Sequence, residues 1–238
     1  MANRKISIVS GEYYHVFNRG NNKSEIFFDN EDRDRFLKLL YLCNSTKAVN
    51  FRDCIVERKI DTWEFDRGKR IVSIGAWVLM PNHFHIYLIE NPKGNLLGRK
   101  GKWTGISTFM SKLCTAYAKY INTKYYRTGT IFEGTFKAEH VINNDHAKYL
   151  FSYIHLNPIK LIESKWKEEG IKDIDAAKKF LNGYWWSSYF DYLKPLRKER
   201  QIINPLDFPR YFKDSKVFEG EIFEWLTLNP KGNLLGKS

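Results

Sequence analysis

The sequence predicts an α+β fold, because segments with strand periodicity and segments with helix periodicity alternate along residues 13–142. They come in the order strand, helix, strand, strand, helix, strand. Only two residues separate the middle strands, as in an antiparallel hairpin. With 238 residues, 43% of them hydrophobic and 16% aromatic, the chain can form one domain with an extension, or two small domains. The element order is that of a ferredoxin-like antiparallel sheet with helices on one face.

The segment YYHVFNRG and the residues after it predict the first strand and the first helix. Residues 13–20 have the pattern of a strand that ends in a turn. Asp29 or Asn30 can then cap an amphipathic helix. We expect the apolar face of this helix to hold Phe36, Leu37, Leu40 and Cys43.

The central hairpin and the second helix follow. Residues 70–80 and 83–90 are apolar strands joined by the short turn Pro81-Asn82. Residues 106–125 have helical spacing, and a glycine-punctuated segment, 127–142, then leads into the last strand of the sheet. The apolar face of this second helix is expected to hold Phe109, Leu113, Tyr117 and Tyr120.

A third helix is predicted between Asn143 or Asn144, which can cap it, and Pro158, which ends it. Its apolar positions follow the spacing of a face that docks on the sheet. These positions are Ala147, Leu150, Phe151 and Ile154.

The charge of the chain indicates its partner. Lysine and arginine number 39 against 27 acidic residues, a net charge of +12 that is spread along the whole chain. This favours a polyanionic partner, most often nucleic acid. No segment approaches the ~18 apolar residues of a membrane span, and residues 1–15 lack the apolar core of a signal peptide, so a cytoplasmic protein without membrane contact is expected. The three cysteines are widely spaced and are expected to be reduced thiols.

Two histidines open the second strand of the hairpin, in the stretch MPNHFHIYL. Because strand side chains alternate between faces, His83 and His85 point to the same side, with Phe84 on the other. Two imidazoles can share a divalent ion, but a metal site needs further ligands.

The third helix can supply the remaining groups. At 100° per residue, His146, Tyr153 and Asn157 share one flank of this helix. A tyrosine oxygen can cleave a phosphodiester and store its energy in a covalent phosphoryl bond. A divalent ion would then align and polarise the phosphate. The two clusters are therefore expected to form one site.

Several motifs in matching order resemble the single-tyrosine His-hydrophobic-His (HUH) transposases, in the branch associated with repetitive extragenic palindromes (REP). The resemblance covers roughly residues 10–192, which predicts a catalytic domain at 1–192 and a C-terminal extension at 193–238 that packs on the domain or contacts DNA. A short helix is expected around residues 221–226 of this extension. The motifs are NRGNN at 18–22, MPNHFHIYL at 80–88, RTGTIFEGTFKA at 127–138, SYIHLNP at 152–158 and WSSY at 186–189.

The resemblance implies a site and a mechanism. Tyr153 maps onto the nucleophile of the family, and Asn157 maps onto its third metal ligand beside His83 and His85. The metal would be Mg²⁺ or Mn²⁺. Single-stranded DNA would be cut next to a folded, REP-like hairpin, with a 5′-phosphotyrosine link and a free 3′-OH. One departure is Thr135, where relatives often carry an arginine, which affects one DNA contact and leaves the catalytic set intact.

Cations interleaved with aromatic residues are expected to contact the DNA, because phosphates need positive charge and unstacked bases need rings. Tyr125, Tyr126 and Phe136 supply the rings. The candidate cations are Arg19, Lys23, Lys112, Lys119, Lys124, Arg127 and Lys137.

Other functions remain open on the sequence alone. A metal-dependent endonuclease could use the same groups without a covalent intermediate, and a hairpin-binding regulator could have lost activity. The chain is expected to act as a monomer or a homodimer. The segment NPKGNLLG occurs twice, at 91–98 and 229–236, and no physical reason for this repeat is evident.

Overall fold

A computed structural model describes residues 7–90, 104–193, 196–209 and 215–228. Its sheet has four antiparallel strands, β1 (Tyr13–Arg19), β2 (Val72–Met80), β3 (His83–Glu90) and β4 (Lys137–His140). The strand order β2-β3-β1-β4 is the order of a ferredoxin-like sheet, which confirms the predicted fold class. Both copies of the repeated segment NPKGNLLG lie outside the described residues.

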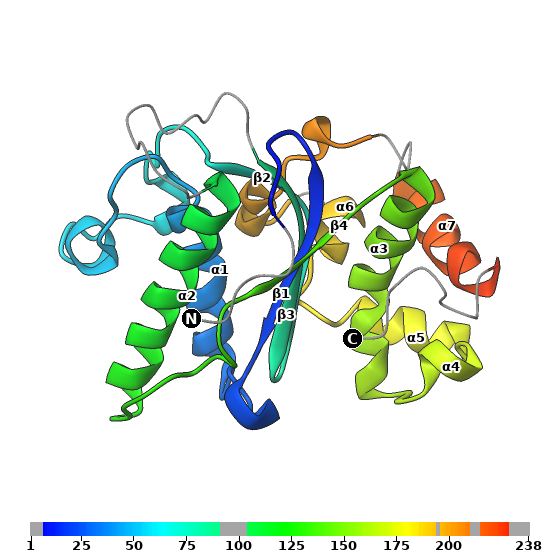
Figure 1. The fold of residues 1–238 in the computed structure, drawn as a ribbon. Coiled ribbons are helices and arrows are strands. Elements are labelled where there is room, and N and C mark those ends of the chain that lie inside the picture. Colours follow the sequence, from blue (N-terminus) through cyan, green and yellow to red (C-terminus); the bar gives the residue numbers. More distant parts are fainter. Residues whose placement is uncertain (1–6, 91–103, 194–195, 210–214, 229–238) are drawn as a thin grey trace.

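The helices cover both faces of the sheet (Figure 1), whereas the sequence predicted helices on one face, because a second apolar core forms on the other side of the strands. The first face carries α1 (Asn30–Cys43) and α2 (Gly105–Lys124), the two helices of the predicted unit. The second face carries α3 (Asn144–Leu156) and α7 (Ser215–Leu228), which pack against each other. Three shorter helices complete this side: α4 (Trp166–Glu169), α5 (Ile174–Leu181) and α6 (Tyr189–Leu193).

The predicted caps are in place. Asp29 forms a capping box with Asp32 at the start of α1, and Asn143 accepts a hydrogen bond from the backbone N–H of His146 at the start of α3. The helix α3 ends at Leu156, just before Pro158. Within the described residues, none of the helices has the length and apolar character that crossing a membrane requires.

Alternation along the strands divides the sheet into two cores. Val16, Phe84 and Ile86 point to the first face and are buried against α1 and α2. Val78 and Tyr87 point to the second face and are buried with the apolar side of α3. His15 and His85 alternate with the first-face residues, so they point to the second face, toward α3.

The C-terminal segment packs on the second face of the sheet. The ring of Phe208 lies 4.9 Å from that of Tyr87, centroid to centroid, and a side chain at Gly75 would collide with it. Glycine in the middle of β2 therefore permits this contact. Phe218 of α7 is buried in the same core as α3. The short helix expected around residues 221–226 lies within α7.

Candidate active site

The site lies on the second face of the sheet, where β1, β3 and β4 adjoin under α3. His85 is paired with Phe17 of β1, and His83 is paired with Arg19. His15 of β1 is paired with Glu139 of β4. Three adjacent strands therefore present ionisable side chains to one helix.

The two histidines of HFH lie together, as their spacing predicts. The ring centroids of His83 and His85 are 5.0 Å apart, and the rings are nearly perpendicular. Asn82 donates its side-chain N–H to the carbonyl oxygen of Lys23, so its amide oxygen faces Nδ1 of His83 at 2.6 Å. That oxygen can only accept, so Nδ1 of His83 carries the proton and Nε2 keeps its lone pair.

Burial keeps both imidazoles neutral. It lowers the pKa of His83 to about 4, assisted by the positive charge of Lys160. Burial also lowers the pKa of His85 well below its ordinary value, and the neighbouring His15 and His83 act in the same direction. Neutral imidazole is the form that binds a metal ion.

The ring of Tyr153, on α3, lies close to two histidine rings of the sheet. Its ring centroid lies 5.4 Å from that of His85 and 6.3 Å from that of His15, both in edge-on geometry. Burial raises the pKa of the Tyr153 phenol, while the Asn157 amide acts to lower it. The structure therefore brings together the tyrosine and the histidine pair that the sequence predicted.

Asn157 follows α3 by one residue and acts on the pKa of both His83 and Tyr153, so it lies beside them. Its buried Oδ1 makes no hydrogen bond within the described part of the chain. No group of three or more His, Cys, Asp or Glu side chains among the described residues could hold a metal ion. Two imidazole nitrogens and one amide oxygen could supply part of the ligand set of a divalent ion; the amide oxygen suits Mg²⁺ or Mn²⁺, whereas imidazole is a softer donor.

Four further residues belong to the surroundings of the site but were absent from the sequence prediction. The Nζ of Lys167 lies 3.9 Å from the centroid of the Tyr153 ring, and Trp166 stacks on the same tyrosine at 6.4 Å. A hydrogen bond joins His15 to His85, and another joins Glu139 to His15. The sequence contains a signal for His15, because alternation along YYHVFNRG places it on the opposite face of the strand from Val16. No local pattern in the sequence pairs Lys167 with Tyr153.

His146, the third member of the predicted helical stripe, is buried, and neither ring nitrogen has a partner among the described residues. It lies near His15 and Glu139, since both act on its pKa. Tyr149 lies one turn before Tyr153 on α3, and their rings are parallel with centroids 6.3 Å apart.

Three of the predicted DNA contacts lie at the His83 end of the sheet. Arg19 ends β1, Lys23 lies in the following turn and Lys137 opens β4, and all three are exposed. Arg19 also forms an ion pair with Glu133 across this end of the sheet. These cations therefore lie at the end of the sheet where β3 begins with His83.

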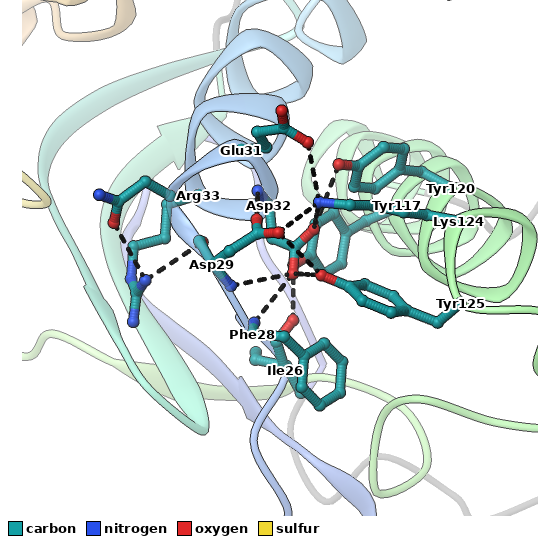
Figure 2. Close-up of polar contacts among 11 residues, drawn as sticks. Ile26, Phe28, Asp29, Glu31, Asp32, Arg33, Tyr117, Tyr120, Lys124 and Tyr125 are labelled. Atoms are coloured by element: carbon teal, nitrogen blue, oxygen red, sulfur yellow. Dashed lines mark hydrogen bonds and ion pairs between the residues drawn. The ribbon is translucent and has the colours of Figure 1, made fainter.

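The other predicted contacts are not brought together with Tyr153, because α2 packs on the first face. Figure 2 shows Lys124 held by acidic side chains of α1: its Nζ lies 2.7 Å from Asp29, 2.9 Å from Asp32 and 3.1 Å from Glu31. Lys112 donates to the carbonyl oxygens of Ser45 and Lys47. Lys119 is exposed on α2, and Arg127 lies over the ring of Phe28. We leave these four cations out of the DNA-contacting set proposed below.

Comparison with known proteins shows a similarity to a solved structure. No family model matches the chain, and no curated protein matches it. Among solved structures, the chain is similar to a REP-associated tyrosine transposase bound to a REP hairpin, with 12% sequence identity and a TM-score of 0.47 over 88% of this chain and 92% of that chain. The function proposed below therefore depends on the residues of the site.

Proposed function

We propose that the chain is a metal-dependent transposase or strand transferase that cleaves and rejoins single-stranded DNA near hairpins through a 5′-phosphotyrosine. The observation that carries this proposal is that the rings of Tyr153 and His85 lie 5.4 Å apart, centroid to centroid, beside the buried Oδ1 of Asn157, which has no hydrogen-bond partner among the described residues. The motifs HFH and SYIHLNP, which resemble those of HUH transposases, support it.

In this reaction, Oη of Tyr153 attacks the phosphorus of a DNA phosphodiester. A bond forms between Oη and phosphorus, and the bond between phosphorus and the 3′ oxygen of the preceding nucleotide breaks. The phenol loses its proton, and the departing 3′ oxygen gains one to become a free hydroxyl. The reverse reaction, with the 3′-OH of another strand as the nucleophile, rejoins DNA and releases the tyrosine.

The residues around Tyr153 would have different roles in this reaction. Mg²⁺ or Mn²⁺ held by His83, His85 and Asn157 would polarise the non-bridging phosphate oxygens. Burial disfavours the Tyr153 phenolate, so a positive charge close to the ring assists the attack. Lys167 supplies that charge, with its Nζ 3.9 Å from the ring centroid. Arg19, Lys23 and Lys137 then hold the flanking strand by its phosphates.

A labelled single-stranded DNA with a hairpin, incubated with the protein and Mn²⁺, tests the proposal. We expect a protein–DNA adduct that survives denaturation. Tyr153→Phe removes one oxygen and keeps the ring, so this variant should still bind DNA but form no adduct. Tyr149→Phe is the matched control on the same helix and should retain the adduct.

The remaining outcomes identify the alternatives. An adduct that persists in Tyr153→Phe would show that another residue is the nucleophile, with Tyr149 the first to examine. Cleavage without an adduct would favour a metal-activated water and therefore the endonuclease. Hairpin binding without cleavage would favour the regulator. Sedimentation with and without the hairpin distinguishes the monomer from the homodimer.

A further inference from the structure

The side chains of His85, His15 and Glu139 lie in a row and are joined by hydrogen bonds. Nδ1 of His85 is 2.8 Å from Nε2 of His15, and Nδ1 of His15 is 3.2 Å from Oε2 of Glu139. The three side chains come from the adjacent strands β3, β1 and β4. Both histidines are buried, at 3% and 7% exposure, so water does not replace these contacts.

The direction of the two hydrogen bonds follows from the carboxylate end. The hydrogen bond from His15 lowers the pKa of Glu139, so this carboxyl group is ionised at neutral pH and can only accept. Nδ1 of His15 must therefore carry the proton that it donates to Glu139. The His15 side chain is buried, and burial disfavours a charged ring, so a neutral His15 that donates from Nδ1 accepts at Nε2.

The same reasoning extends to His85. Because Nε2 of His15 accepts, Nδ1 of His85 carries a proton and donates it. A neutral imidazole carries one N–H, and the 2.8 Å contact with His15 places it on Nδ1 of His85, so Nε2 keeps its lone pair. The opposite tautomer of His85, with the proton on Nε2, would break the row of hydrogen bonds or require His15 to be a cation.

We propose that Glu139 and His15 are positioning residues that hold His85 in the tautomer whose Nε2 is open to a metal ion. The use of that nitrogen as a ligand rests on the proposed function, whereas the tautomer itself does not. Residues that hydrogen-bond a metal-binding histidine fix its tautomer and orientation, and their loss typically lowers metal affinity by about 10–100-fold. The geometry assigns this role to His15 on β1, which pairs with the HFH strand, and to Glu139 on β4, the next strand beyond it.

The decisive measurement is the tautomer of each histidine in the metal-free protein, from the ¹⁵N chemical shifts of its ring nitrogens and their couplings to ring protons. In the full chain at pH 7.5, we expect His15 and His85 to be neutral and protonated on Nδ1. A wild-type His85 protonated on Nε2, or a cationic His15, would overturn the proposal. The measurement uses neither DNA nor metal, so its failure is distinct from failure of the transposase assignment.

Glu139→Leu tests the cause. This variant removes the acceptor from a side chain that is 32% exposed at the end of the row, so the fold should persist, as near-ultraviolet circular dichroism can verify. Part of the His85 population should shift to the Nε2–H form, and Mn²⁺ affinity measured by calorimetry should fall about 10-fold. An unchanged tautomer together with unchanged Mn²⁺ affinity would contradict the assignment.

Glu12→Gln is the matched control, because it removes another carboxylate nearby. Glu12 lies 3.0 Å from Nε2 of His140 on β4, outside the row. Its replacement should leave the His85 tautomer unchanged and alter Mn²⁺ affinity only slightly. If it lowers Mn²⁺ affinity as much as Glu139→Leu does, the effect of Glu139 is one of general negative charge, and the positioning role fails.

Discussion

Among the described residues, aromatic and imidazole rings and the ammonium group of Lys167 lie around Tyr153, and they would govern its reactivity in the proposed cleavage. Burial alone raises its pKa, which would make it a poorer nucleophile than a tyrosine in water. The Asn157 amide acts to lower the pKa of the phenol. The Nζ of Lys167 lies 3.9 Å from the ring centroid, where a positive charge would favour the phenolate. The balance between these opposing effects is testable by removing the ammonium group.

We expect Lys167→Met to slow adduct formation by about 100-fold, the usual effect of removing one group that stabilises developing negative charge. Lys167→Arg should retain most of the rate, because it keeps a cation over the ring. Single-turnover kinetics with hairpin DNA and Mn²⁺ measure the effect. Lys165→Met is the control on an exposed neighbour, and an equal loss there would show that Lys167 has no special role.

The proposed ligands should differ in importance. His83→Ala and His85→Ala each remove an imidazole nitrogen and should abolish cleavage and most Mn²⁺ binding, as calorimetry would show. Asn157→Ala should cost less, because a neutral amide oxygen is the weakest of the three donors. His140→Ala is the control, since this histidine pairs with Glu12 outside the ligand set. Normal Mn²⁺ binding by the His85 variant would reduce the HFH pair to a packing role.

At the scale of elements, the start of α1 and the end of α2 are joined by one polar cluster (Figure 2). Asp32 is fully buried there and accepts hydrogen bonds from Lys124, Tyr120 and Tyr125. It also completes the capping box of α1 by accepting from the backbone N–H of Asp29, and it accepts from the backbone N–H of Phe28. Burial alone would lower the pKa of Lys124, but its acidic partners outweigh this and raise it. Lys124 is therefore a structural cation.

Lys124→Met should lower the free energy of unfolding by about 1–3 kcal/mol, because a buried carboxylate loses its counter-charge. Urea denaturation measures this loss, and hairpin DNA affinity should stay unchanged. Lys119→Met, an exposed change on the same helix, should fall within about 0.5 kcal/mol of the wild type. Equal stability of the Lys124 and Lys119 variants would show that the cluster contributes nothing.

The stabilising effect of Lys124 should also depend on pH. The hydrogen bond from Lys124 lowers the pKa of Asp29 to about 2, below its unfolded value of about 3.9. A carboxylate with a lowered folded pKa stabilises the protein above the unfolded pKa and loses this effect as pH falls through the folded pKa. The stabilities of the wild type and Lys124→Met should therefore converge as pH falls from about 4 to about 2.

Across the described chain, three exposed cations lie at the same end of the sheet as the candidate site. The net charge of +12 would attract a polyanion from any direction, whereas Arg19, Lys23 and Lys137 lie at the sheet end next to His83. The first face instead uses Lys112 and Lys124 for contacts within the chain. The proposed DNA path therefore follows the His83 end of the sheet toward α3.

Single strands with a hairpin should bind more tightly than the matching duplex, because unstacked bases can reach the site. Affinity should fall steeply with salt, and Lys137→Gln should reduce the slope of log K against log salt by about 1. Lys119→Gln, on the first face, should leave the slope unchanged. Filter binding across a salt series measures both variants. Equal affinity for duplex and single strand at matched salt would contradict the proposed substrate.

Several local features were determined by the sequence. The alternation of HFH places both histidines on one face, and the helical period places Tyr153 and Asn157 on one flank of α3. Asp29 and Asn143 cap the helices that they were predicted to cap. The order of strands and helices was sufficient for the fold class. These features depend on residues within one or two turns of each other, where periodicity and capping chemistry act directly.

Only the tertiary structure decided which distant groups meet. His15 and His85 are separated by 70 positions along the chain, and His15 and Glu139 by 124. No pattern in the sequence predicts that Lys167 lies over Tyr153, or that Lys124 is held by three carboxylates while Lys137 stays exposed. Such contacts arise when strands pair and helices dock. The apolar faces that drive docking bring their polar neighbours into contact, and a sequence read locally does not contain that geometry.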